Sequence, residues 1–249
     1  MTRPTRRSRL LTVASALAAL LCAREAQGGR THYGWLYGTE VNPERGVEIE
    51  SWILQENGKD GEDETLAWWA PVVGLTEHLE LAIPLEAAYS AEGGEGSTNF
   101  ERFGGELRYR FNSPDPLVAG PITVLARGAV KRLVQARSGM RGEADLVVAF
   151  EQGRFHAEVD LGSIAERVSE DDSEVELRPG GGFSIETVSL LRVGAEAYAE
   201  LGVHGETKDW LAIGPTVSLT RGRFWASGTV PIGVFGIDTA PRINFAIAF

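Results

Sequence analysis

The stretch Leu191-Arg-Val-Gly-Ala-Glu-Ala-Tyr-Ala-Glu-Leu-Gly202 alternates strictly between two kinds of residue. Its odd-numbered positions are Leu, Val and Ala, whereas its even-numbered positions include Arg, Glu and Tyr. In a β-strand successive side chains point to opposite faces, so this stretch predicts a strand with one apolar and one polar face. The segments 154–165 and 78–91 divide in the same way.

Alternation of this kind recurs through most of the chain after residue 45, where no helix-length stretch has a convincing apolar stripe at helical spacing. The pattern predicts twelve strands, which are long compared with the typical length of about five or six residues. They cover residues 46–56, 63–75, 78–91, 99–112, 121–134, 140–151, 154–165, 173–185, 188–203, 208–220, 223–235 and 239–249.

The connections between these strands alternate between short turns and longer polar loops. Short turns are predicted near residues 76–77, 152–153, 186–187 and 222, with one longer link at 113–120. Longer loops are predicted at 56–63, 91–97, 135–139, 166–172, 204–208 and 236–239. This alternation is typical of a transmembrane β-barrel whose short turns are periplasmic, and an even number of strands places both termini on that side.

The apolar strand faces are rich in small residues, which bears on whether they face lipid or a core. A soluble barrel of this size would need bulky side chains to fill its lumen, whereas lipid needs no such filling. The sequence therefore predicts an all-β, antiparallel up-and-down transmembrane β-barrel over residues 46–249. Aromatic residues near the predicted strand ends suggest two interfacial belts. The outer belt would contain Trp52, Trp68, Tyr89, Phe100 and Trp210. The periplasmic belt would contain Tyr109, Phe111, Phe150, Phe155, Phe224 and Phe249.

The first residues predict export. Four arginines precede the apolar run 10–23, and small residues follow, as in a secretory signal covering residues 1–26. A membrane anchor is disfavoured because the run is shorter than the roughly 20 residues that a spanning helix needs. Lipidation of Cys22 is disfavoured because Leu21, not a small residue, precedes it. Cleavage would remove the only Cys and leave a formal charge more negative than the -11 of the full chain.

Composition excludes several classes of protein. The 249 residues are 43% hydrophobic and contain 35 acidic against 24 basic side chains, which is globular and acidic. Nucleic-acid binders concentrate positive charge, so nucleic acid is not an expected partner. Outer-membrane lipid is the expected surrounding.

The sequence ends in Arg242-Ile-Asn-Phe-Ala-Ile-Ala-Phe249. This ending resembles the C-terminal signal of bacterial outer-membrane barrels. The resemblance implies that Phe245, Ile247 and Phe249 are recognised by the barrel-assembly machinery and that the protein lies in the outer membrane of a Gram-negative bacterium. The segment 33–52 resembles the opening of a loose group of uncharacterised outer-membrane proteins akin to transporters assigned to aromatic-degradation pathways. That resemblance implies passage of small hydrophobic or aromatic molecules and carries over no catalytic residue.

The polar strand faces predict a charged lumen. Folding each hairpin about its loop is expected to bring Lys131 near Asp145, Asp160 near Arg178, and Arg178 near Glu196. Such a lumen either selects solutes by its transverse field or forms a structural charge network that partly closes the barrel. Asp145 facing Asp160 would also offer a site for a divalent cation. The predicted pore-lining residues are Arg102, Arg108, Arg110, Arg127, Lys131, Glu143, Asp145, Glu158, Asp160, Glu174, Glu176, Arg178, Arg192, Glu196 and Glu200.

Residues 27–45 precede the barrel and allow three interpretations. Tyr33, Trp35 and Tyr37 alternate with Gly34, Leu36 and Gly38. The segment is a short strand inside the lumen, a plug, or a periplasmic lead-in. A plug would make the barrel gated or closed.

The sequence offers little support for catalysis. Of His32, His78, His156 and His204, only His204 is placed at the outer end, where barrel hydrolases act, and its spacing fixes no Ser or Asp partner. Neither a paired His motif nor a Cys cluster predicts a metal, and no cofactor is expected. Gly180-Gly181-Gly182 is interpreted as strand curvature or relief around neighbouring side chains.

Three functional hypotheses follow from the sequence. The leading hypothesis is a monomeric, non-enzymatic barrel for passive passage of small solutes. The rival is a non-conducting structural or surface-interaction barrel with a locked luminal charge network. A surface hydrolase is the remote alternative.

Overall fold

The computed structural model describes residues 31–249 apart from 60–62, 93–94, 114–117, 119, 137, 170–171 and 206. The predicted signal peptide, residues 1–26, and the first part of the segment 27–45 lie outside the described residues. No helix in the described part of the chain is long and apolar enough to cross a membrane.

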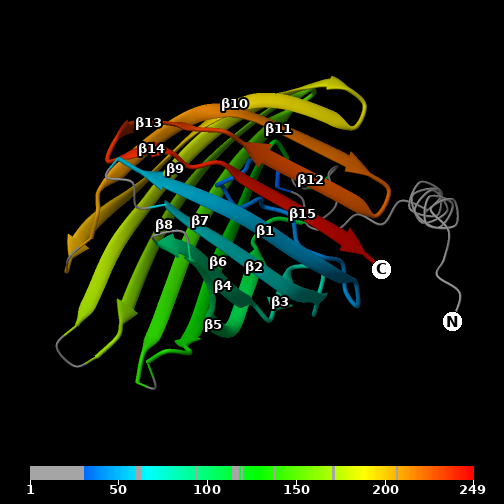
Figure 1. Cartoon of the computed structure of the whole chain (residues 1–249). Coiled ribbons are helices and arrows are strands. Elements are labelled where there is room, and N and C mark those ends of the chain that lie inside the picture. Colours follow the sequence, from blue (N-terminus) through cyan, green and yellow to red (C-terminus); the bar gives the residue numbers. More distant parts are fainter. Residues whose placement is uncertain are drawn as a thin grey trace, which may run out of the picture.

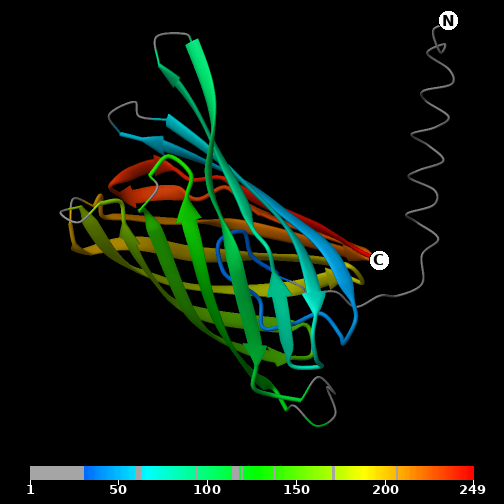
Figure 2. The ribbon, with the colours of Figure 1, turned by 90° about the horizontal axis from the view of Figure 1, so that it is seen from below.

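The described residues form a single antiparallel sheet that closes on itself (Figures 1 and 2). Adjacent runs of the wall pair antiparallel, with β3 and β4 both lying between β2 and β5. The last strand, β15, returns to pair with β1 from Glu48 opposite Ala248 to Leu54 opposite Arg242. The strands are β1 (Val47–Gly58), β2 (Asp63–Gly74), β3 (Leu79–Ala82), β4 (Leu85–Glu92), β5 (Glu95–Arg110), β6 (Ile122–Leu133), β7 (Met140–Gln152), β8 (Phe155–Arg167), β9 (Ser173–Val188), β10 (Leu191–His204), β11 (Trp210–Arg221), β12 (Phe224–Thr229), β13 (Ile232–Phe235), β14 (Ile237–Thr239) and β15 (Arg242–Ala248).

Proline accounts for the difference between these strands and the twelve that the sequence predicts. Pro84 separates β3 from β4, Pro231 separates β12 from β13, and Pro241 separates β14 from β15. Proline has no backbone N–H to donate to a neighbouring strand, so the ladder is interrupted at each position. Counted as continuous runs across the wall, the described strands make the twelve-stranded up-and-down barrel that was expected, and the fold class is confirmed.

The two faces of the wall differ as the alternation predicts. Along β11, Ala212, Thr216 and Ser218 are buried inside, whereas Ile213 and Val217 are 49% and 48% exposed on the outer surface. Other strands repeat this division, so the outer surface is apolar and the lumen is polar. A closed ladder with an apolar exterior leaves no unpaired strand edge in lipid, which is the requirement for a strand-built membrane span.

The start of β1 and the end of β15 lie side by side at the end of the barrel that carries the short turns. The backbone N–H of Phe249 donates to the carbonyl of Val47 at 2.8 Å. Hairpins extend farthest at the opposite end, where β4 and β5 project beyond their neighbours (Figure 2). The C-terminal strand places Phe245 and Phe249 outward, with exposed fractions of 37% and 63%.

The prediction of aromatic belts is wrong for three tryptophans. Trp68 and Trp210 are buried inside the barrel, at 5% and 4% exposure, and Trp52 stacks on Trp68 with 6.2 Å between ring centroids. Strand parity is the reason, because Trp52 lies two residues from the inward-facing Glu50. The neighbouring Trp69 has the opposite parity and is 42% exposed on the outer surface.

Candidate functional site in the barrel lumen

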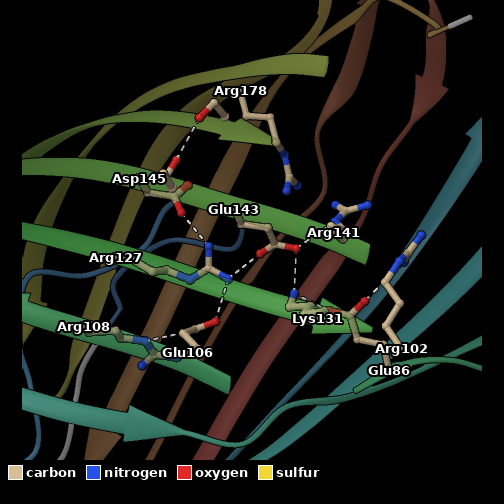
Figure 3. Close-up of polar contacts among 12 residues, drawn as sticks. Glu86, Arg102, Glu106, Arg108, Arg127, Lys131, Arg141, Glu143, Asp145 and Arg178 are labelled. Atoms are coloured by element: carbon tan, nitrogen blue, oxygen red, sulfur yellow. Dashed lines mark hydrogen bonds and ion pairs between the residues drawn. The ribbon is translucent and has the colours of Figure 1, made fainter. Parts of the chain in front are cut away.

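A continuous network of ion pairs covers one side of the lumen (Figure 3). Its centre is Arg127 of β6, whose side chain is 1% exposed. The guanidinium lies 2.6 Å from Glu106 of β5, 2.5 Å from Glu143 and 2.5 Å from Asp145, both of β7. One cation thus holds three carboxylates from the two neighbouring strands.

Two further cations extend this network in opposite directions. Lys131 donates to Glu86 at 2.5 Å and to Glu143 at 2.7 Å. Arg108 contacts Glu106 at 2.6 Å and also donates to carboxylates on β1 and β3, Glu50 and Glu80. The chain of contacts therefore ties β1 and β3 through β7 together across the lumen.

Two of the ion pairs expected from the sequence are wrong in register. Lys131 lies opposite Arg141, and the partner of Asp145 is Arg127. Arg178 contacts Glu200 at 3.0 Å, whereas Glu196 lies opposite Gly182. The error arises because the length and shape of each connecting loop set the register, and these cannot be derived from alternation.

Most of the predicted luminal charges are enclosed by the barrel. Asp160, expected beside Arg178, lies opposite Gly180, and Gly162 is opposite Arg178. Buried are Arg108, Arg127, Lys131, Glu143, Glu158, Asp160, Arg192 and Glu196, and partly buried are Arg102, Arg110, Asp145, Glu174, Glu176, Arg178 and Glu200. Sequence reasoning missed Glu48, Glu50, Glu80, Glu86, Glu106, Arg141 and Arg242 as candidates. Strand parity could have identified these residues, since they share faces with residues that were chosen.

Residues 31–42 run inside the barrel, and an exposed turn at 43–46 connects them to β1 (Figure 1, blue). Tyr33 is 0% exposed and Trp35 is 2% exposed. The backbone N–H groups of Gly34 and Trp35 donate to the two carboxylate oxygens of Glu196 on β10, at 2.8 and 3.0 Å. Of the three interpretations from the sequence, these contacts match a segment held in the lumen and not a periplasmic lead-in.

The opposite side of the same segment is held by β12 and β15. The carbonyl of Tyr33 accepts hydrogen bonds from Ser227 at 2.7 Å and from Asn244 at 3.0 Å. The indole N–H of Trp35 donates to the carbonyl of Ala240 at 3.0 Å. Farther along, the N–H of Tyr37 donates to Asp160 at 3.2 Å, and its ring lies 4.2 Å below the guanidinium of Arg127.

The glycine run in β9 makes room for this segment. A side chain at Gly182 would overlap the ring of Tyr33, and one at Gly180 would overlap Leu36. Gly181 has the opposite parity, and a Cβ there would meet only the carbonyl of Glu158 at an ordinary 3.5 Å. The relief around neighbouring side chains that was expected for these glycines is therefore relief for the luminal segment.

The segment divides the remaining space in the lumen. A cavity of about 200 Å³ lies at the long-loop end, beside Glu56 and Arg102. A smaller cavity of about 50 Å³ lies deeper in the barrel. Tyr37, Trp52 and Arg242 line both cavities and therefore form the partition between them.

The histidines and paired aspartates do not form a recognisable reaction centre. The hydroxyl of Tyr33 lies 3.1 Å from Nδ1 of the buried His156, and His204 is exposed at the end of β10. Asp145 and Asp160 each bond to a protein donor, Arg127 and the N–H of Tyr37. Within the described residues no group of three or more His, Cys, Asp or Glu is arranged to hold a metal ion.

Comparisons with known proteins give a structural likeness without a sequence likeness. No protein-family model and no curated protein matches the chain. An outer membrane channel from Pseudomonas putida F1 superposes with a TM-score of 0.58 at 10% identity, covering 85% of this chain and 98% of the channel.

Two further solved structures share the fold. The KdgM porin, solved in complex with disordered oligogalacturonate, has a TM-score of 0.53 at 10% identity over 81% of this chain and 99% of its own. The β domain of the Bordetella autotransporter BrkA has a TM-score of 0.54 at 12% identity over 82% and 99%. The fold is that of bacterial outer-membrane β-barrels and, together with the apolar exterior, it assigns the chain to the outer membrane, as the sequence predicts.

Proposed function

We propose that the protein is an outer-membrane channel for small solutes whose lumen is closed, in the state described, by residues 31–42. Solutes pass by diffusion once this segment, the luminal plug, has moved aside. The charged wall then selects among them electrostatically. The expected pore-lining residues keep that role within this proposal.

The observation that carries the proposal is the way the luminal plug is attached. Its backbone donates hydrogen bonds to Glu196 and Asp160 and accepts one from Asn244, and the side chains of Trp35 and Leu36 pack in a buried apolar cluster with the wall. The hydrogen bonds exchange for bonds to water at little net cost, since a typical hydrogen bond contributes only about 0.5–1.5 kcal/mol. The main free-energy cost of displacing the plug is therefore the exposure of its buried apolar side chains. The plug also lies outside the closed ladder, so its departure breaks no strand pairing.

The side of the wall that contacts the plug supports the same function. Small side chains line this side of the lumen, among them Gly182, Thr216, Ser218 and Ser227. These small side chains leave room around Tyr33, whereas Tyr198 and Trp210 of the same side pack against Trp35. Without the plug, a solute path would remain beside the ion-pair network, which would stay in place.

The second candidate function is a non-conducting barrel that acts through its surface loops. The ion-pair network favours it, because Arg127 and Lys131 are each held by two or more carboxylates and are nearly inaccessible. In that case both the network and the plug are permanent parts of the interior. The two candidates differ in whether the plug moves.

A reversible tether tests this difference. A Cβ at Gly34 would lie 2.9 Å from the Cβ of Thr229 on β12, so the pair Gly34→Cys and Thr229→Cys is close enough for a disulfide after a small shift. The only native Cys, Cys22, lies in the predicted signal peptide. The recording is single-channel current in a planar bilayer, with the wild type and each single Cys variant as controls.

The proposed channel predicts intermittent openings for the wild type, silence for the oxidised double variant, and openings again after reduction. Openings that persist in the fully oxidised variant would show that the path does not require displacement of the plug. Silence of the wild type and of the reduced variant, both verified as folded barrels, would favour the non-conducting candidate.

A further inference from the structure

Arg242 differs from the other buried cations of the lumen in lacking a carboxylate partner. Four of the five buried cationic side chains in the described residues have ion pairs of 2.5–3.1 Å: Arg108, Arg127, Lys131 and Arg192. Arg242, only 7% exposed, has a single hydrogen bond, from Nε to Asn244 at 3.3 Å. No ion pair joins it to a carboxylate anywhere in the described chain.

Two tryptophans enclose the guanidinium of Arg242. Its central carbon lies 4.5 Å from the ring centroid of Trp52 and 5.2 Å from that of Trp35. Stacked rings stabilise a cation through their faces but accept no hydrogen bond from N–H groups that lie in the guanidinium plane. The two terminal nitrogens are therefore available to a hydrogen-bond acceptor on a ligand in the lumen.

The space beside Arg242 has both polar and apolar walls. The guanidinium lines the cavity of about 200 Å³ at the long-loop end, together with Leu54 and Leu66. Seven glutamates and four further basic side chains also line this cavity, among them Glu56, Arg141 and Arg178. Carboxylates thus outnumber the basic groups even with Arg242 included, which disfavours a second negative charge on a ligand, whereas an apolar group would find an apolar surface.

We infer that Arg242 binds the carboxylate of a small organic monoanion with a short apolar body, at the partition between the two luminal cavities. The planar guanidinium can donate two parallel hydrogen bonds to one carboxylate, and Leu54 and Leu66 receive the apolar part. This inference rests on the proposed function, because it names the class of solute that the closed channel admits to its outer cavity.

The test is calorimetric titration of the folded protein in detergent micelles with hexanoate, and with hexanol as the uncharged analogue of the same length. The site predicts that Arg242→Gln weakens hexanoate binding by at least about tenfold, the size of effect that loss of a charge-assisted pair gives. Arg221→Gln is the control, since it removes an equal charge from an exposed arginine at the end of β11 that lines neither cavity. It should leave the affinity for hexanoate within about twofold.

Equal affinity of the wild type for hexanoate and hexanol would overturn the inference, as would an unchanged affinity in Arg242→Gln. If Arg242→Gln does not fold, Arg242→Lys decides. It keeps the charge but loses the planar fork, so affinity should fall partway, and an unchanged affinity would again contradict the site. Hexanoate binding and channel current are independent measurements. Hexanoate binding to a barrel that carries no current would refute only the proposed channel. Current through a barrel that does not bind hexanoate would refute only the proposed site.

Discussion

Gly182 and Glu196 face the same few residues of the luminal plug from two neighbouring strands. Glu196 accepts from two of its N–H groups, and Gly182 leaves the space that the ring of Tyr33 fills. Glu196 supplies hydrogen-bond acceptors and Gly182 supplies space, and together they specify where the plug lies. Their roles can therefore be separated by substitution.

We expect Gly182→Val to expel the plug without disturbing the ion-pair network. The added side chain would occupy the place of Tyr33, and such overpacking costs about 1–3 kcal/mol. The expected readouts are more frequent openings in bilayer recordings and faster proteolysis of the plug in the intact barrel.

Gly181→Val is the control for this substitution. Gly181 faces outward between the same neighbours, and Val is favoured in strands. It should behave as the wild type. Equal opening frequencies in the two variants would mean that the space at Gly182 does not control the plug.

A second residue-scale prediction concerns Arg127. Arg127→Ala leaves Glu106, Glu143 and Asp145 in the lumen without the cation that joins them, and breaking a buried pair in this way costs about 3–5 kcal/mol. We expect a lower free energy of unfolding in urea, measured in lipid vesicles.

The exposed Arg221 provides the control, because Arg221→Ala removes an equal charge from the end of β11. Its unfolding free energy should stay within about 0.5 kcal/mol of the wild type. If Arg127→Ala alters conductance and leaves stability unchanged, the network is part of the solute path and not a structural brace.

At the scale of elements, the C-terminal strand separates folding from assembly. β15 closes the barrel through its backbone pairing with β1. The side chain of Phe249 is 63% exposed and points outward, away from the lumen. We propose that the barrel-assembly machinery recognises this aromatic side chain, and we therefore expect Phe249→Ala to reduce the amount of protein assembled in cells several-fold.

Refolding of purified Phe249→Ala into detergent should proceed as for the wild type, with Ala248→Ser on the luminal face as the control. Assembly would be followed by heat-dependent migration on gels. An equal loss of cellular assembly and of refolding in the purified protein would contradict a recognition role and indicate a purely structural one.

The strands show how far the sequence leads and where it stops. Alternation in 191–202 establishes which side chains face inward, since parity is a local property of a strand. It does not establish that Lys131 pairs across from Arg141, because register depends on loop geometry. Trp68 lies near a strand end, as a belt residue would, but its parity directs it into the lumen.

The breaks at Pro84, Pro231 and Pro241 follow only in part from the sequence, because Pro71, Pro179 and Pro215 lie within unbroken strands. A residue without an N–H weakens a ladder, and whether the strand breaks there depends on the surrounding wall. The position of residues 31–42 inside the barrel could not be derived, because a short segment with two tyrosines and a tryptophan packs equally well in several places. Its contacts to Glu196 and Asn244 depend on the assembled wall.

At the scale of the whole molecule, the interior consists of two parts with different attachments. The ion-pair network joins neighbouring strands of the wall, so it can change only if the barrel itself is disturbed. The plug touches the wall from within and is connected to it through the turn before β1. This difference is the reason for describing the protein as a closed channel and not as a filled barrel.

The most direct test of this description is single-channel conductance of a variant lacking residues 31–42, beside the wild type, in a planar bilayer under a salt gradient. The turn at Pro43–Gly46 stays in place, because the N–H of Gly46 donates to Pro43 and that of Gly74 donates to Gly46. We predict stable, ion-selective current steps for the variant and only brief openings for the wild type. Silence of the variant, verified as a folded barrel, would contradict the closed channel and assign the interior a structural role.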